Sequence, residues 1–105
     1  MLDVGYTKVP NILFQAATRL SQNELRVLLN ILRHTYGFQR TQTEVSSRAI
    51  AQWAGINHPE VIKALRKLRD KGLIELSCSN RYIITVEERK LRIACLQLLD
   101  GQEEA

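Results

Sequence analysis

Two short helical patterns separated by only three residues constrain this fold more than any other feature of the sequence. Ser46 can cap the first pattern, residues 47–54, and Gly55 suits the sharp backbone turn that ends it. Asn57 can cap the second by accepting a hydrogen bond from the backbone N–H of Glu60. A short helix, a tight turn with glycine and a second helix with a strong start predict a helix-turn-helix.

The segment after the second helix has the pattern of a β-hairpin. Gly72 ends the helix, and two extended segments follow, residues 73–76 and residues 82–86, the latter rich in β-branched and aromatic side chains. The polar stretch 77–81 would be the hairpin loop, and Glu44 with Val45 would add a third strand. We therefore predict a mostly helical chain with a small antiparallel sheet, a winged helix-turn-helix in which the hairpin loop is the wing.

Two further helices precede this unit. Pro10 suits the first position of a helix that runs through Leu20. Ser21 and Glu24 have the spacing of a capping box, which starts a central helix whose apolar stripe is wide enough to pack on two sides. We expect Gly37 to be the left-handed residue that ends this helix.

Residues 87–99 return to helical periodicity and carry one apolar stripe. A compact body formed by residues 1–86 would have little surface left to cover it, so we expect residues 87–105 to mediate self-association. The competing interpretation is intramolecular, with the stripe packed on the first helix of its own chain. The residues of the predicted dimerisation stripe are Leu91, Ala94, Cys95, Leu98 and Leu99.

Charge is distributed unevenly along the 105 residues, which suffice for one compact unit. Residues 1–86 hold 12 basic and 6 acidic side chains, whereas residues 87–105 hold 3 and 5. The body is therefore +6 and the tail −2, for a net charge of +4. A positive body favours a polyanionic partner.

Signatures of enzymes and of metal sites are missing from the sequence. It has no Walker loop, nucleophile elbow or HExxH motif, and Cys78 and Cys95 have neither a CxxC partner nor a nearby histidine to complete four ligands. His34 is expected at the surface, and Trp53 in the core. We therefore expect no catalysis, cofactor, metal or disulfide. We also expect a soluble cytoplasmic protein, because no apolar run approaches the length of a membrane span.

On a helix over residues 58–71, one face is apolar and the opposite face basic. Asn57 and His58 would enter the major groove first, Arg66 would contact bases, and Lys67 phosphate. The other interpretation is a solvated helix surface, partly neutralised by Glu60 and Asp70. The full set of predicted DNA contacts is Arg48, Asn57, His58, Lys63, Arg66 and Lys67, with Asn80 and Arg81 from the wing.

Three sequence blocks then show a family resemblance. Residues 5–13 (GYTKVPNIL), 25–29 (LRVLL) and 33–38 (RHTYGF) resemble the amino-terminal, origin-binding domain of phage replication protein O. The resemblance covers most of residues 5–75 and implies a winged helix that binds repeated sites at a phage or prophage replication origin, often as a dimer.

Members of that family carry a further carboxyl-terminal region that engages a helicase or helicase loader, and the 105 residues hold no counterpart of it. Either that region lies on a longer protein, or the role of this chain is narrower. Two alternatives stay open: a transcription regulator of the same fold that binds an operator, and a winged helix used only for protein contacts.

Overall fold

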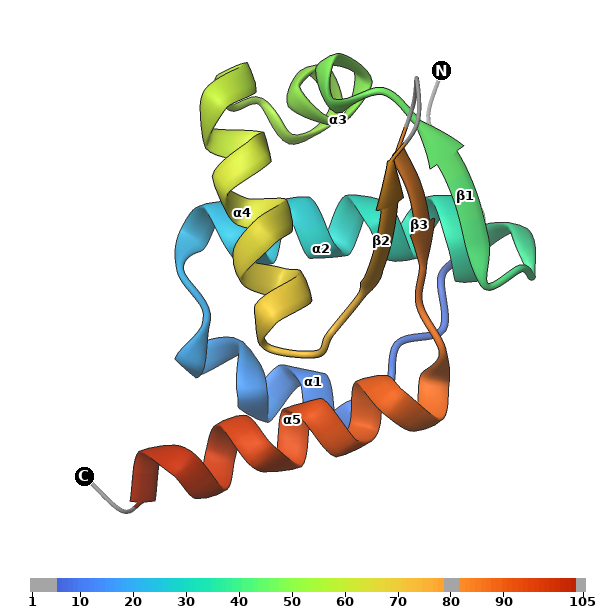
Figure 1. The fold of residues 1–105 in the computed structure, drawn as a ribbon. Helices are drawn as coiled ribbons and strands as arrows, with labels where there is room; N and C mark the ends of the chain where they lie inside the picture. Colours follow the sequence, from blue (N-terminus) through green and yellow to red (C-terminus); the bar gives the residue numbers. More distant parts are fainter. Residues whose placement is uncertain (1–5, 79–81, 104–105) are drawn as a thin grey trace.

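The computed structural model describes residues 6–78 and 82–103. These residues form helices and strands in the order that a winged helix requires, with an additional helix at each end (Figure 1). The α-helices are α1 (Asn11–Ala16), α2 (Gln22–Thr35), α3 (Ser47–Ala54), α4 (His58–Asp70) and α5 (Glu88–Glu103). The strands are β1 (Gln42–Val45), β2 (Glu75–Cys78) and β3 (Tyr82–Thr85), and 3-10 turns cover Ala17–Arg19 and Tyr36–Phe38.

The three strands form one antiparallel sheet in the order β1-β3-β2. Val45 pairs with Tyr82, and Cys78 pairs with the same residue from the other side. The predicted fold class is thus confirmed, including the third strand. The first hairpin strand begins two residues later than expected, because the backbone N–H of Leu73 donates to the carbonyl of Leu68 and so belongs to the turn that ends α4.

Helix α2 lies at the centre of the molecule, behind α4 and the sheet in Figure 1. Its residues Val27, Leu28 and Leu32 are completely buried. They share one core with Leu65 of α4 and Ile84 of β3. The wide apolar stripe seen in the sequence therefore has the expected cause, since α2 packs against several elements at once.

The start of α2 differs from a complete capping box. Ser21 accepts a hydrogen bond from the backbone N–H of Glu24 at 3.2 Å, as predicted. The Glu24 carboxylate does not return to the backbone N–H of Ser21: it accepts from the Ser21 hydroxyl at 2.9 Å and from Lys71, the residue that follows α4. Glu24 is only 3% exposed, so this carboxylate joins α2 to the end of α4.

Gly37 does not end α2 in the left-handed conformation, and that prediction is wrong. Tyr36–Phe38 form a 3-10 turn, and the left-handed residue is Gln39, with φ of 58°. Gly37 serves another purpose, because a Cβ there would lie 2.9 Å from Oγ1 of Thr7. The glycine lets the N-terminal segment pass close to the end of α2.

The stripe of α5 is covered by its own chain, so the reason for expecting dimerisation through it does not hold. Leu91, Ala94 and Cys95 are at most 3% exposed and belong to the common core, and Leu98 packs against that core while Leu99 is half-buried. Figure 1 shows α5 lying along α1. This is the intramolecular arrangement that the sequence left open as the competing interpretation: α1 supplies the surface, including Leu13 and Ala16.

Candidate nucleic-acid interface

The turn between α3 and α4 has the predicted local structure. Ser46 caps α3 by accepting from the backbone N–H of Ala49 at 3.1 Å. Gly55 adopts φ of +70°, and the backbone N–H groups of Gly55 and Ile56 both donate to the carbonyl of Ala51. A residue with a side chain would be strained at Gly55, so the glycine fixes the direction in which α4 leaves.

A side-chain hydrogen bond joins the starts of the two helices. The Ser47 hydroxyl lies 2.5 Å from Nε2 of His58, and both residues are half-buried. His58, predicted as a DNA contact, therefore holds α4 against α3. Asn57 forms no side-chain cap, contrary to expectation, because the backbone N–H of Glu60 donates to the main-chain carbonyl of Asn57 at 3.0 Å instead. The Glu60 carboxylate binds the side chains of Asn23 and Lys63. The exposed Asn57 amide is consequently not engaged at the helix start.

Helix α4 has one buried face and one basic face, as the periodicity predicts. The buried residues are Val61, Ala64, Leu65 and Leu68, each at most 3% exposed. On the other side Lys63, Arg66 and Lys67 are all exposed. The structure thus brings these three predicted residues together on one surface of one helix.

The acidic side chains near this surface are already paired. The Glu60 carboxylate lies 3.6 Å from Nζ of Lys63, and Asp70 pairs with Arg69 at 3.3 Å. Arg66 forms no hydrogen bond or ion pair with any residue in the described ranges. Its guanidinium is therefore available to engage an external anion.

The ion pair between Glu24 and Lys71 anchors the far end of α4. Burial by itself raises the pKa of the Glu24 carboxyl, but hydrogen bonds from Lys71 and Ser21, with the positive charges of Lys71 and Lys67, bring the pKa below its ordinary value. Glu24 is therefore ionised near neutral pH. The Glu24 carboxylate also acts on the edge of the basic face, since Lys67 is one of the charges that lower its pKa.

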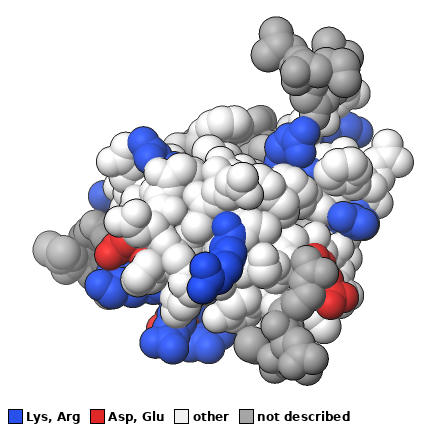
Figure 2. Space-filling model, turned by 90° about the horizontal axis from the view of Figure 1, so that it is seen from above, with Lys and Arg blue, Asp and Glu red and all other residues white. Residues whose placement is uncertain are grey.

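Of the remaining predicted DNA contacts, the structure locates Arg48 but not the two wing residues. Arg48 is exposed in the first turn of α3, at the end of the molecule where α4 also begins (Figure 1). Asn80 and Arg81 lie outside the described residues. Figure 2 shows this end from above: separate Lys and Arg side chains are spread over the face, both at its edges and near its middle, and fewer acidic side chains are visible.

Trp53 lies at the surface, which corrects the expectation of a core residue. It is 40% exposed, and its ring stacks on the half-buried ring of His34 at 3.8 Å between centroids. An eight-residue helix buries one narrow face, which Ile50 occupies, so Trp53 falls beside the core. Sequence reasoning missed this pairing, because it depends on how α3 crosses α2.

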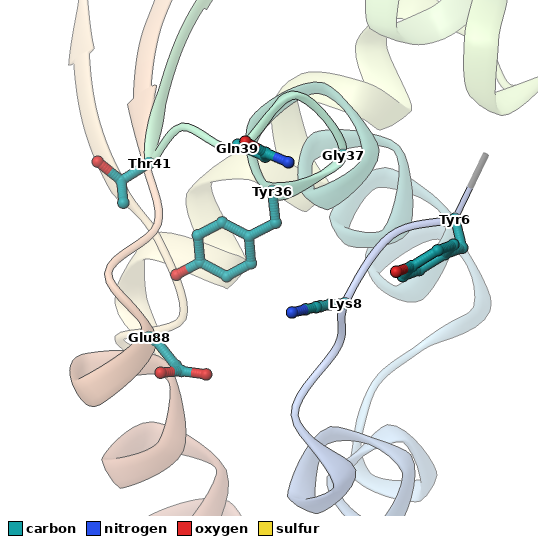
Figure 3. A pocket seen from close by; sticks show the side chains of 7 residues that line it. All are labelled: Tyr6, Lys8, Tyr36, Gly37, Gln39, Thr41 and Glu88. Atoms are coloured by element: carbon teal, nitrogen blue, oxygen red, sulfur yellow. The ribbon is translucent and has the colours of Figure 1, made fainter.

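A pocket of about 730 Å³ lies away from α4, between the N-terminal segment, the end of α2 and the start of α5 (Figure 3). Tyr36 borders it and donates from its hydroxyl to the carbonyl of Val86 at 2.7 Å. Burial, with the negative charges of Glu88 and Glu87, raises the pKa of Tyr36. No sequence pattern indicates this pocket, whose lining residues are Tyr6, Lys8, Tyr36, Gly37, Gln39, Thr41 and Glu88.

Other kinds of site receive no support within the described ranges. Across residues 6–78 and 82–103, no three or more His, Cys, Asp or Glu side chains gather as metal ligands would. None of the helices in that part of the chain combines the length and apolar character needed for a membrane crossing. The basic face of α4 is thus the feature on which function is best argued.

Comparison with protein families shows the family to which the chain belongs. Residues 1–89 match the family model for bacteriophage replication protein O. The chain belongs to the replication protein O family. A relative within phages, replication protein 15 of Enterobacteria phage phi80, is 33% identical over 75 residues, which make up 70% of this chain and 25% of the relative. The chain therefore spans about a quarter of that relative's length.

Solved structures support the winged-helix architecture for this member of the replication protein O family. The ST1889 protein of Sulfolobus tokodaii has a TM-score of 0.62 at 17% identity, with 89% of each chain covered. The DNA complex of MepR from S. aureus has a TM-score of 0.54 at 20% identity, covering 88% of this chain and 73% of MepR. A mutant of the plasmid segregation protein TubR has a TM-score of 0.55 at 14% identity, covering 95% and 100%.

Proposed function

We propose that this chain binds double-stranded DNA in a sequence-specific manner, at a phage or prophage replication origin, and that α4 is the helix that enters the major groove. The observation that carries the proposal is the exposed basic face of α4, Lys63, Arg66 and Lys67, on a helix whose other face is fixed in the core. A rigid helix with free cationic side chains is the element that winged helices insert into the groove.

Different roles follow from the positions of these cations. Arg66 can donate two parallel hydrogen bonds to O6 and N7 of guanine, since no ion pair within the described part of the chain holds its guanidinium. Lys67 offers a point charge suited to phosphate, and Lys63 must first leave Glu60. Arg48 at the start of α3 and Arg81 in the wing would extend the phosphate contacts.

The family supports a replication role over the alternatives. Both the matched model and the phi80 relative are replication proteins, and the DNA-bound MepR structure shows that a protein of similar fold binds DNA. A transcription regulator or a winged helix used for protein contacts would share the fold without that relationship. The resemblance implies that contacts to a helicase or its loader are made by regions of the family that this chain does not cover. We propose those contacts only for a longer protein that includes such a region.

The test is selection of bound fragments from a phage or prophage genome, followed by gel shift with the purified chain. We expect fragments with repeated sites beside replication genes. A single palindrome within a promoter would instead indicate the regulator, and no duplex affinity at low salt would indicate a protein-contact module.

Variants on α4 show whether it is the reading helix. Arg66→Ala should cost about 1–3 kcal/mol of specific binding and relax the preference at one base step. Lys67→Ala should weaken specific and random duplexes alike and reduce the salt dependence. The matched control is Arg89→Ala, an exposed arginine on α5, which should change neither. Unaltered binding by both α4 variants, with the fold intact, would exclude α4.

A further inference from the structure

A second surface, which DNA binding by α4 does not use, lies where α3 crosses the end of α2. Four side chains form it, and we name them the aromatic–arginine patch: His34, Phe38, Arg40 and Trp53. The rings of His34 and Trp53 stack at 3.8 Å with an interplanar angle of 7°, and the Phe38 ring lies 6.1 Å from that of His34. The Arg40 guanidinium carbon is 5.4 Å from the centroid of Phe38.

The patch is ordered by hydrogen bonds although it is exposed. The backbone N–H of Arg40 donates to the carbonyl of Thr35 at 2.9 Å, and its side-chain Nε donates to the carbonyl of His34 at 3.2 Å. Nδ1 of His34 is 2.8 Å from the carbonyl of Asn30. Yet Phe38 remains 57% exposed and Trp53 40% exposed. Large apolar side chains held in place at the surface are typical of an interaction site.

The chain segments that carry the patch are mainly basic. Residues 25–59 contain four arginines and a single carboxylate, that of Glu44. Arg26 is exposed on α2 and lies two steps of four residues before His34, so that Arg26, Asn30 and His34 follow one side of the helix. Asn30 links this row, because its side-chain amide donates to the carbonyl of Arg26 at 2.9 Å. A ligand lying along α2 would meet Arg26 at one end of this row and Arg40, which is hydrogen-bonded to the His34 carbonyl, at the other.

We propose that the aromatic–arginine patch docks an acidic amphipathic segment of a partner protein, with carboxylates on Arg40 and Arg26 and apolar side chains on Phe38 and Trp53. Nucleic acid suits this surface less well. One face of the Trp53 ring is covered by His34, and Arg40 lies over Phe38, so the faces on which bases would stack are partly taken. The patch also lies on α2, α3 and the segment 36–40 that follows α2, whereas the proposed reading face belongs to α4.

The single tryptophan makes the patch directly observable. Because Trp53 is the sole tryptophan of the chain, its fluorescence emission reports this site alone. The probe is a synthetic amphipathic helical peptide built of Leu and Glu without aromatic residues, and the control peptide carries Lys in place of Glu. We expect a saturable change of Trp53 emission with the Glu peptide and none with the Lys peptide.

Charge reversal then locates the binding site. Arg40→Glu should weaken the Glu peptide by about tenfold or more, since arginines at the centre of an interface commonly carry that much binding energy. Arg89→Glu, at a matched exposed arginine on α5, should leave affinity unchanged. Binding of the wild-type chain should also weaken as salt is raised, a measurement that needs no variant and so holds even if Arg40→Glu fails to fold.

The outcomes separate this inference from DNA binding. Lys63→Ala with Arg66→Ala should abolish specific DNA binding while the Glu peptide binds as before. Equal affinity of the wild type and a folded Arg40→Glu variant for the Glu peptide, or a lack of any Glu-peptide binding, would overturn the inference. Loss of duplex affinity in Arg40→Glu, without peptide binding by the wild type, would assign the patch to nucleic acid instead.

Discussion

The Glu24–Lys71 ion pair should contribute strongly to stability, because it leaves a carboxylate almost without water. Lys71→Met removes the cation while Glu24 stays 3% exposed. Breaking a fully buried pair costs about 3–5 kcal/mol. The Lys71 side chain is 29% exposed, so solvent screens part of the interaction. We therefore expect a loss of about 2–3 kcal/mol in the free energy of unfolding.

Urea unfolding followed by circular dichroism measures this loss, and a thermal melt should fall by at least about 8 °C for a domain of this size. The matched control is Lys90→Met, whose ion pair with Glu75 is more than half exposed on both sides, and which should change stability little. The double variant Glu24→Gln with Lys71→Met should regain much of the loss, since no charge is then left unpaired. A single variant as stable as the Lys90 control would refute the reasoning.

The pH dependence gives an independent check on the same carboxylate. Its folded pKa lies below the ordinary value of 4.5, so its stabilisation is complete above that value and is lost as pH falls through the lowered folded pKa. Lys71→Met removes two of the influences that lower the pKa, so burial should raise it. The variant's deficit relative to wild type should then shrink between about pH 7 and about pH 4. A deficit that does not change with pH would show that the carboxylate is not its source.

Three further variants or reactions probe the packing. Gly37→Ala should cost about 1–2 kcal/mol through its contact with Oγ1 of Thr7, and Thr7→Ala in the same chain should restore most of it, both read from urea unfolding. Leu91→Glu should unfold the chain or cost more than about 3 kcal/mol rather than give a folded monomer, as sedimentation with circular dichroism would show. In a Cys78→Ser background, Cys95 should resist iodoacetamide until the chain unfolds, because burial raises the pKa of its thiol.

The sequence predicted those parts of the fold that depend on neighbours along the chain. Ser46 and Gly55 act within one helical turn of their own positions, so the start and end of α3 follow from local chemistry. The orientation of α4 follows from periodicity alone, since the residues that alternate between core and solvent are set by 100° per residue. For the same reason the three cations of the proposed reading face could be selected without a structure.

The predictions that failed depend on segments distant in the sequence. Gly37 is placed by Thr7, which arrives from the N-terminal segment, and Trp53 is placed by His34 across two helices. Each local pattern was compatible with its expected role, and each was overridden by a contact that periodicity cannot reveal.

The role of α5 in the fold can be inferred from the core contacts of its residues and from the point at which the family match ends. The match ends at residue 89, yet Leu91, Ala94 and Cys95 fill the same core as the rest of the domain. Gly72, which ends α4 with φ of +80°, has the Ala94 side chain 3.6 Å from where its own Cβ would lie. The turn that ends the proposed reading helix therefore lies close to a residue beyond the matched region. A chain cut at residue 89 would lose Leu91, Ala94 and Cys95 from the core, so we expect lower stability than that of the full chain and a loss of DNA affinity that follows the loss of folding, as urea unfolding and gel shift would show. A cut chain as stable as the full chain would contradict this role of α5.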